Sequence, residues 1–525
     1  MKKTTKSIII AVAVVLVLVG ALFAVINLVP NNNNGDNTQS ATYPTDANGE
    51  QYATDSKGNK IDSIKDKDGN IVSAGEVDLI SKGPLKLEEI DVQNKSGQYT
   101  IKVSREKIDE KEATTPDGEP TGETEKPVYT IVGFEDESTQ IGQPDSIANV
   151  VSNLRTLDII DIKGENLKDY GLDKPLAVVT GKFTDGTESI VKIGNDAPGG
   201  TETYIQYGND KAVYLVSHDA IKAVFYSPLD LISLEITPSS TTSENNQPIS
   251  VTLTGTNYPQ KVVLVSNDDE TVGAYFKMTS PKEAPANVTL ASEITGKIKG
   301  ISAEKVLAVN PTTAQMKSFG LDKPVAQIEA KFLDGTIVLQ AGKVDENGKV
   351  NIYSKDNNVV YLISANMVAW ATASYDELKY EYIAKPLVDY VKTVKVTVDG
   401  KTYSYDLAKK TVKDLDGNET EELTVKSGGK DIKTAYFETF YNNLTNVLRE
   451  ESADKYKKDG SAVLKVEFVY NNGKATDTVE YYNAGNRKYI AQVNSVADGV
   501  VYETYINQIK QDVKSLAKNE RVNPI

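Results

Sequence analysis

The sequence predicts an α+β protein with an N-terminal transmembrane helix, followed by tandem related units that each combine antiparallel strands with one or two packed helices. Three observations support this fold class. Residues 8–29 form an uncharged apolar run, a six-residue block occurs twice, and the same order of hairpin and helix surrounds each copy. With 525 residues, the chain is long enough for three or four domains of ordinary size.

The composition excludes several classes of function. Acidic residues outnumber basic ones by 74 to 58, for a net charge of −16, so a nucleic acid would be repelled. The chain has no Cys and 1 His, which leaves no thiolate and almost no imidazole for metal binding or catalysis. We therefore expect no nucleic-acid partner, no cofactor, and no catalytic, cofactor-binding or metal-binding residues.

The apolar run at residues 8–29 has the length of a membrane span. Its 22 residues would form a helix of about 33 Å, against a hydrocarbon core of about 30 Å. Lys2, Lys3 and Lys6 precede the run, so the positive-inside rule places tail 1–7 in the cytoplasm and the body outside the cell membrane. A cleaved signal peptide is the alternative interpretation.

Residues 30–84 have the composition of a linker and turn-rich stalk. They are rich in Asn, Asp, Thr, Ser and Gly and poor in large apolar residues. Asp66, Asp68 and Gly69 are typical of a turn. The alternative, a calcium loop, would need later ligands and a bidentate Glu that are absent from this stretch.

The clearest internal signal is a repeat. YGLDKP at 170–175 returns as FGLDKP at 319–324, KFTDGT at 182–187 returns as KFLDGT at 331–336, and VYLVS at 213–217 returns as VYLIS at 360–364. The blocks keep their order along the chain. We therefore predict repeat unit 1 at 85–235 and repeat unit 2 at 236–390.

A weaker third copy follows at 391–525. VEFVYNNG at 466–473 corresponds to the strand and turn, and GVVY at 499–502 corresponds to the later strand. The GLDKP block is missing, so we predict a divergent repeat unit 3.

Each unit is predicted to open with a hairpin and continue with an amphipathic helix. The hairpins pair residues 87–92 with 99–103, 249–254 with 261–265, and 394–398 with 402–407. Asp145 is a candidate N-cap of the first helix. The apolar stripes of the three helices are Ile147, Val150, Val151, Leu154 and Leu157; Leu290, Ile294, Ile298 and Ile301; and Phe437, Phe440, Tyr441, Leu444 and Leu448.

The repeated block has a structural explanation. A helical turn ending at Tyr170 can use Gly171 as its left-handed C′ residue and Leu172 as the apolar contact, and Pro175 then starts a strand. Asp173 and Lys174 recur as Asp322 and Lys323. They are interpreted as a local ion pair or turn, with a binding feature as the less favoured alternative.

His218 and the acidic stretch at 106–125 are two further candidates for a functional role. His218 follows a strand and Ser217, which is expected to cap a short helix; the histidine is interpreted as a surface or capping residue rather than a catalytic base. The acidic stretch at 106–125 is interpreted as a solvated loop insertion, with a partner-docking finger as the alternative. The chain also contains neither a phosphate-binding Gly-Lys loop nor a Gly-x-Ser-x-Gly nucleophile elbow.

The order of the anchor, the hairpin, the helix, YGLDKP, Asp185-Gly186, Ile193-Gly194 and VYLV resembles the bacterial family called domain of unknown function 4340. The resemblance covers residues 85–375 in two copies. It implies an extracytoplasmic, membrane-anchored protein and carries over no catalytic residues. Some members resemble auxiliary components encoded beside gliding-motility-type ABC transporters, so the resemblance implies an ABC transporter permease or ATPase as partner.

Two functions follow as expectations. The favoured one is a non-enzymatic accessory or binding protein on the outer face of a bacterial membrane, associated with an ABC-type transport system. The alternative is a cell-surface structural or adhesive protein.

Overall fold

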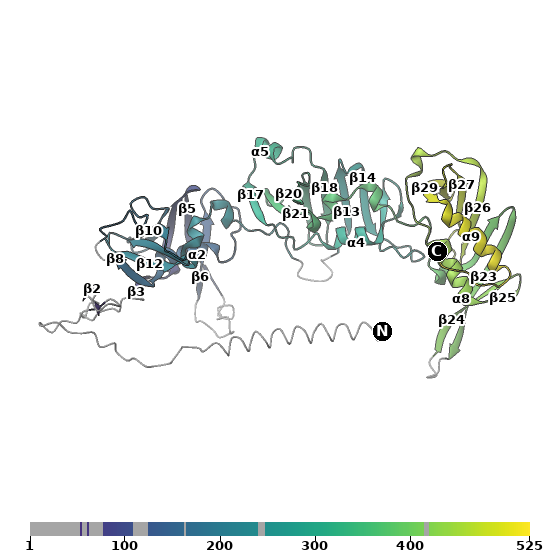
Figure 1. The fold of residues 1–525 in the computed structure, drawn as a ribbon, viewed down its shortest axis with the longest axis horizontal. Coiled ribbons are helices and arrows are strands. Elements are labelled where there is room, and N and C mark those ends of the chain that lie inside the picture. Colours follow the sequence, from purple (N-terminus) through teal and green to yellow (C-terminus); the bar gives the residue numbers. More distant parts are fainter. Residues whose placement is uncertain are drawn as a thin grey trace. The chain divides into compact units, whose positions relative to one another are not determined.

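The computed structural model describes residues 53–54, 60–61, 77–108, 124–161, 164–239, 247–413 and 419–525. Three large sheets follow one another along the chain (Figure 1). By their contacts, the described residues up to Lys95 form one compact part with 146–224, and residues 96–145 form the other with 225–525. The predicted tandem units of mostly antiparallel strands, with few helices, are confirmed.

The strands of each sheet are given in their spatial order. The first sheet is β6 (Glu125–Ile131), β5 (Gly97–Lys107), β4 (Leu87–Asn94), β9 (Ala177–Phe183), β10 (Glu188–Asp196), β11 (Glu202–Tyr207), β12 (Val213–Ser217) and β8 (Asp158–Asp161). The second is β16 (Ala284–Pro285), β15 (Phe276–Ser280), β14 (Tyr258–Ser266), β13 (Ser250–Gly255), β18 (Ala326–Lys331), β19 (Thr336–Ala341), β20 (Lys349–Ser354), β21 (Val359–Ser364) and β17 (Lys305–Val309). The third is β25 (Lys430–Ile432), β24 (Glu419–Ser427), β23 (Lys401–Lys413), β22 (Val391–Val398), β26 (Asp459–Tyr470), β27 (Asp477–Asn483), β28 (Lys488–Val493) and β29 (Val496–Tyr502).

The three sheets share one topology. The first strand of each unit, β4, β13 or β22, lies inside the sheet, with the next two strands of the chain on one side of it. On its other side the first strand pairs with β9, β18 or β26, and the next three strands of the chain follow in order. In the first and second sheets β8 and β17, which precede β9 and β18 in the chain, occupy the far edge; the third sheet has no counterpart among its described strands. Repeat unit 3 is therefore a copy of the same fold, although it lacks the GLDKP block. The three predicted hairpins are confirmed.

In each unit a helix follows the hairpin strands and precedes the strand that pairs with the other side of the first one. These helices are α2 (Gln143–Ser152), α4 (Val288–Gly296) and α8 (Thr434–Thr445). The other helices are α3 (His218–Ile221), α5 (Thr313–Ser318), α6 (Ala369–Thr372), α7 (Tyr375–Leu378) and α9 (Glu503–Leu516), with short 3-10 turns at Pro84–Lys86, Lys222–Phe225, Pro228–Leu231, Ala365–Met367, Val388–Tyr390 and Ala453–Lys455.

The helices end earlier than predicted. Helix α2 stops at Ser152, and Asp145 lies inside its first turn instead of capping it. Leu154 belongs to β7 (Asn153–Thr156), and Leu157 is 38% exposed. Ile298 and Ile301 are buried beyond the end of α4, and Leu448 is exposed beyond the end of α8. In each case the residues after the helix form backbone hydrogen bonds with another segment of the chain.

That pairing joins the segment before each unit to the segment after its helix. In the first unit β3 (Val77–Ser81) pairs with β7. In the second, the Ile236 amide donates to the Ile301 carbonyl at 2.8 Å. In the third, the Ile383 amide donates to the Val447 carbonyl at 3.0 Å. Each unit therefore begins before its first hairpin, and β3 falls within the range predicted as stalk.

The repeated GLDKP block is a helix terminator. Gly171 and Gly320 have φ of 70° and 71°. The amide of Leu321 donates to the Met316 carbonyl at 2.8 Å, and that of Gly320 to the Lys317 carbonyl at 3.1 Å, which is the Schellman pattern of helix ends. Residues 167–172 form the same two bonds. Leu172 and Leu321 are buried, so the predicted C′ role and the predicted apolar contact are confirmed.

The repeated Asp-Gly turn holds a lysine in both copies. Lys299 donates to Asp334 at 2.7 Å with its ammonium 4.4 Å from the Phe332 ring centre, and its side chain is 5% exposed. Lys82 binds Asp185 and Phe183 in the same way but comes from a different place in its unit. The Asp and Phe of the repeated block therefore form a lysine site within the fold.

The last strand of the second sheet's main series and that of the third each pack against a side chain from outside the sheet. Leu321 of the GLDKP block packs with Ala308 and Val360 of β21, whereas Tyr456 packs with Val500 of β29, the strand that corresponds to β21. Lys488 donates to the Tyr456 hydroxyl at 2.8 Å.

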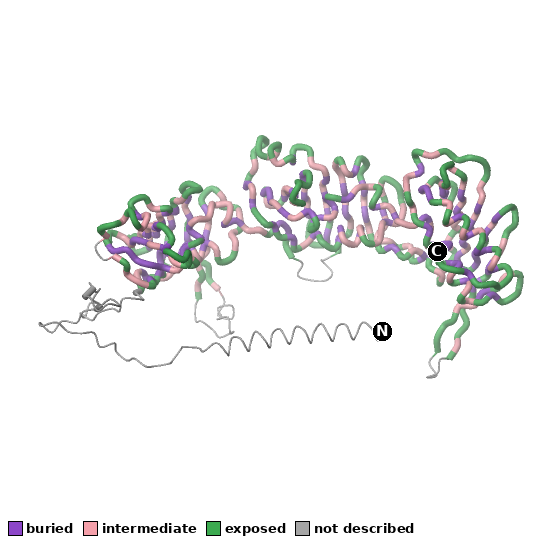
Figure 2. The backbone as a smooth tube through the Cα atoms, in the orientation of Figure 1, coloured by how far each residue is buried: buried purple, intermediate pink, exposed green. Residues whose placement is uncertain are grey.

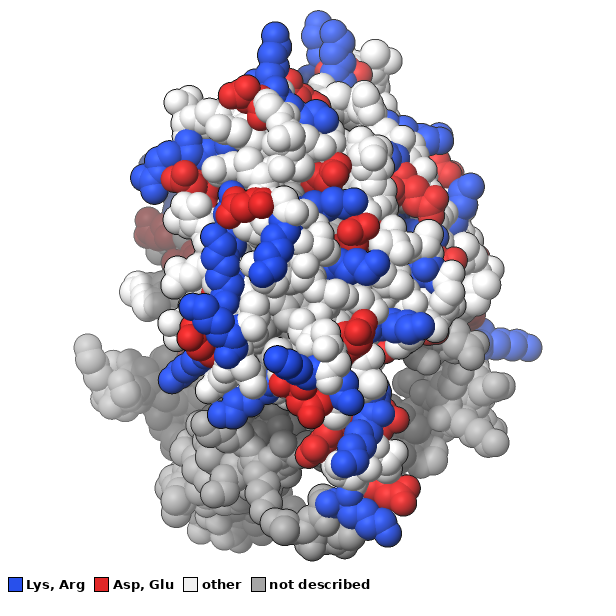
Figure 3. All heavy atoms as spheres, turned by 90° about the vertical axis from the view of Figure 1, so that its right-hand side faces the viewer, with Lys and Arg blue, Asp and Glu red and all other residues white. Residues whose placement is uncertain are grey.

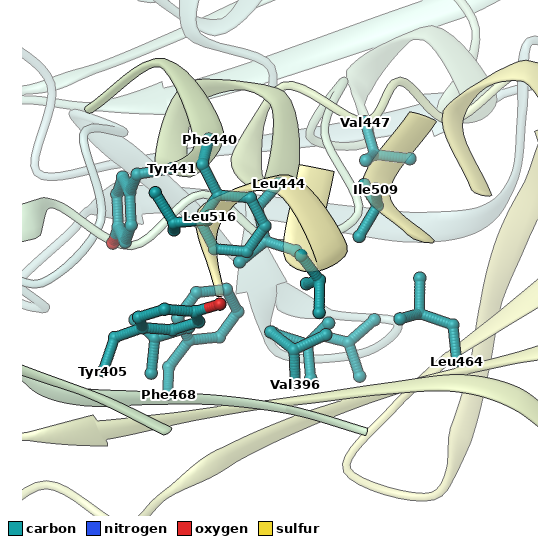
Figure 4. Close-up of a cluster of buried hydrophobic side chains, with 14 of the residues drawn as sticks. Val396, Tyr405, Phe440, Tyr441, Leu444, Val447, Leu464, Phe468, Ile509 and Leu516 are labelled. Atoms are coloured by element: carbon teal, nitrogen blue, oxygen red, sulfur yellow. The ribbon is translucent and has the colours of Figure 1, made fainter. Parts of the chain in front are cut away.

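The core of the third unit lies between its sheet and the helices α8 and α9. Figure 4 shows the aromatic and aliphatic side chains of this cluster, with the Tyr405 ring centre 5.6 Å from that of Phe440. Along the strands of all three sheets, buried positions alternate with exposed or intermediate ones (Figure 2). Asp512 is buried beside this core and accepts hydrogen bonds from Asn443 and Gln508; burial raises its pKa.

The predicted tail 1–7 and transmembrane helix 8–29 lie outside the described residues. Most of the predicted stalk, including Asp66 and Asp68, does so as well. In the part of the chain that the structure describes, no helix combines the length and apolar character needed to cross a membrane.

We expect Gly171→Ala to destabilise its unit more than Gly320→Ala destabilises the second. Each substitution should lower the free energy of unfolding by about 1 kcal/mol, because alanine is strained at a positive φ. Only at Gly171 would the new Cβ also lie 2.5 Å from the Asn195 side chain, whereas nothing lies within 4 Å at Gly320. The measurement is calorimetric melting of the full chain with each variant. An undisturbed melt for Gly171→Ala would show that the terminator role is wrong.

Candidate functional site

A cleft of about 750 Å³ lies within the compact part that includes residues 225–525. One wall comes from strands β14 to β16, and the opposite wall comes from the β26–β27 turn and the β28–β29 turn. The floor is the connection at residues 379–386. Its volume is in the range of ligand pockets, which hold about 300 to 1,000 Å³.

Backbone pairings fix the floor on both sides. On one side Lys379 forms a bridge with Ala286, and Pro386 with Val272. On the other side Tyr382 forms a bridge with Leu448. Three separate backbone bridges therefore fix the position of this connection between the two walls.

A lysine joins the two walls. Lys474, in the β26–β27 turn, donates to the carboxylate of Asp269 and the hydroxyl of Thr271 at 2.7 Å each. Its ammonium also lies 3.4 Å from Asp477 and 4.6 Å from the Tyr470 ring centre. Burial acts to raise the pKa of Asp269, but the hydrogen bonds from Lys474 and Thr271 outweigh it and hold that pKa below its usual range.

Two more lysines of the cleft lie over tyrosine rings. Lys379 is 4.7 Å from the Tyr375 ring centre, and Lys385 is 3.7 Å from the Tyr382 ring centre. Such cation–π contacts contribute about 0.5 to 1 kcal/mol at exposed sites and restrict the lysine rotamer. The three lysines are therefore held in place by the cleft's own tyrosines.

Arg449 connects the floor to β29. Its guanidinium donates to the carbonyl of Tyr380 and to the carboxylate of Asp498. The Nε atom of Arg449 and the Oε2 atom of Glu381 are buried and have no hydrogen-bond partner in the described structure. The arginine side chain is 12% exposed, so it supports the wall rather than presenting a free charge.

His218 belongs to a polar cluster elsewhere, in the first unit. Its Nδ1 lies 3.0 Å from Asp196 Oδ1 and 3.1 Å from Thr203 Oγ1. Thr203 donates to Asp196 at 2.6 Å, and the bonds from Thr203 and His218 lower the pKa of Asp196. Ser217 occupies the N-cap position of α3 without a capping side-chain bond, so the predicted cap is wrong in that detail.

The other residues weighed from the sequence are not brought together. Asp173, Lys174, Asp322 and Lys323 are exposed, and no salt bridge of the described residues joins either pair, so the predicted ion pair is not formed. For the acidic stretch at 106–125, β5 and β6 pair as far as Lys107 with Glu125, and residues 109–123 lie outside the described residues.

Within the described ranges, no group of three or more metal-ligating side chains is found.

Sequence reasoning missed the cleft because its walls come from distant stretches of the chain. One signal was available in the spacing. Tyr375 and Lys379, Tyr382 and Lys385, and Tyr470 and Lys474 each stand three or four residues apart. Only the structure shows that these pairs line one cavity.

A family model described as "Domain of unknown function (DUF4340)" matches residues 136–274 and 276–459. The two matches cover more than half of the chain. The chain belongs to this family. The suspected resemblance is confirmed, and the match extends through the hairpin and helix α8 of repeat unit 3.

Each match begins in the hairpin or crossover of one unit and ends inside the next. The first runs from before α2 to the loop before β15, and the second from β15 to the start of β26. No curated protein and no solved structure matches the chain.

We expect Lys474→Met to lower the free energy of unfolding at neutral pH by about 1 to 3 kcal/mol, because a part-buried carboxylate loses its partner. The pKa of Asp269 is lowered in the folded state, so its contribution is present above the unfolded value of about 4 and is lost as the pH falls through the folded value. The difference between wild type and variant should therefore shrink below about pH 4.

The measurement is urea unfolding followed by the fluorescence of Trp370, the single tryptophan, which is buried in the second unit. Lys465→Met is the matched control, because Lys465 only approaches Glu467 at 3.4 Å on the surface of the third sheet. Equal stability of Lys474→Met and Lys465→Met at neutral pH would contradict the role of Lys474.

Proposed function

We propose that this protein is a membrane-anchored, extracytoplasmic binding protein that serves as an accessory component of an ABC-type transport system and has no catalytic activity of its own. The observation that carries the binding role is the cleft between β14–β16 and β26–β29, which is held open by backbone bridges on its floor. A rigid, mixed polar and apolar cleft is suited to recognition.

The location rests on the sequence. The apolar run at 8–29 with three preceding lysines favours a single-pass anchor with the body outside the cytoplasm. Such an anchor confines the search for a partner to the membrane plane and raises its effective concentration. The proposal of an ABC transporter as partner rests on the family resemblance.

The surface supports a protein partner better than a nucleic acid. On the face shown in Figure 3, lysine and arginine are interspersed with aspartate and glutamate, without a field of one sign. The net charge of −16 opposes binding to phosphate polymers.

The test is site-specific photo-crosslinking of the full-length protein in its native membrane. Val496 is 49% exposed at the rim of the cleft, and Leu333 is 70% exposed away from it, in the β18–β19 turn. With the photoreactive residue at position 496, we expect recovery of an ABC permease or ATPase; position 333 is the matched control. Recovery of a wall polymer instead would favour an adhesive protein, and the accessory role would be rejected.

A further inference from the structure

The floor of the cleft offers an unpaired stretch of backbone. The amides of Ala384 and Lys385 and the carbonyl of Ala384 form no hydrogen bond with any described residue, although Ile383 before them and Leu387 after them are both paired. The Lys385 carbonyl belongs to the bridge between Pro386 and Val272. Ala384 and Lys385 both line the cleft. Backbone N–H and C=O groups are strong hydrogen-bonding groups, so this stretch presents donors and acceptors to a ligand.

The charges of the cleft nearly balance. Five basic and six acidic residues line it. Most are paired with each other: Lys379 with Asp376, Lys474 with Asp269, and Arg449 with Asp498. This balance favours a ligand without a large net charge over a phosphate or a metal cation.

The aromatic rings are covered by other groups. Tyr375, Tyr382 and Tyr470 each have a lysine over the ring, and the edge of Tyr380 meets Tyr382 with ring centres 5.6 Å apart. Tyr380 and Tyr470 are also buried. A sugar ring needs an open aromatic face to stack on, and the lysines occupy one face of three of these rings, so the arrangement offers fewer such faces to a carbohydrate.

Apolar side chains also line the cleft, interspersed with polar ones such as Asn494 and Glu283. Val493, Val496 and Ala497 flank the β28–β29 turn, and Val272 and Pro285 lie on the other wall. Side chains of this kind pack against apolar side chains of a ligand. Unpaired amides and apolar side chains in one cleft together match a polypeptide, which presents both peptide groups and side chains.

We propose that this cleft binds a segment of polypeptide through main-chain hydrogen bonds to residues 384 and 385. The inference rests on the proposed function as a binding protein and names its ligand class. Main-chain hydrogen bonds would supply affinity that depends little on the peptide's sequence, and the apolar side chains of the cleft would favour peptides with apolar side chains.

The test uses the full-length protein in lipid nanodiscs and peptides selected on it from a random display library. Ala497→Arg, which places a long side chain at the rim, should weaken peptide binding by about tenfold or more. Ala314→Arg is the matched control, because Ala314 is exposed on α5 and does not line the cleft. Equal binding by both variants, or the absence of any selected peptide, would overturn the proposal.

A second pair of variants isolates the main-chain contact. Lys385→Ala removes the side chain and keeps the amide, whereas Lys385→Pro removes the amide donor as well. Lys385 precedes Pro386 and is already restricted to extended backbone, which proline can also adopt. We expect Lys385→Ala to stay within about threefold of wild type and Lys385→Pro to lose about tenfold. Equal affinities for the two would overturn the main-chain contact.

The outcomes also separate this proposal from the transporter role. If a glycan array gives ligands that Ala497→Arg blocks, the peptide is rejected while a binding protein remains. If peptides bind as described but crosslinking recovers no transporter subunit, the peptide cleft stands and the accessory role fails.

Discussion

The pairing of the segment before each unit with the segment after its helix is the constraint on which the rest of the structure depends. It occurs as β3 with β7, as Ile236 with Ile301, and as Ile383 with Val447. The pairing follows each crossover helix, and the chain then leads to β9, β18 or β26. In each unit that strand pairs with the first one, so the three sheets share the order of their central strands.

The third of these pairings also builds the cleft. Residues 379–386 connect the second sheet to the third unit, and their bridges alternate between Ala286, Leu448 and Val272. Between the last two bridges, the amides of Ala384 and Lys385 are left unpaired among the described residues. The connection that organises the third unit thus also forms the floor of the cleft. Lys474 joins the two walls through its hydrogen bond to Asp269.

Much of the fold was predictable because its signals are local. The hairpins and the Gly171 and Gly320 terminators follow from residues adjacent in the chain. The ends of the helices were not predictable. Leu154 and Ile301 continue an apolar stripe in the sequence, but their backbones lie beyond the helix and pair with a distant segment of the chain. The cleft was missed for the same reason: Tyr375, Arg449 and Lys474 meet only through nonlocal pairing.

Amide hydrogen exchange along residues 379–388 and 445–450 of the full-length protein tests the central claim most directly. The amides of Ile383, Leu387 and Arg449 donate to the carbonyls of Val447, Thr271 and Glu381 at 3.0, 2.8 and 2.8 Å. The account predicts slow exchange at these three positions and fast exchange at residues 384 and 385 between them. Uniformly fast exchange along the whole connection would contradict a preformed floor.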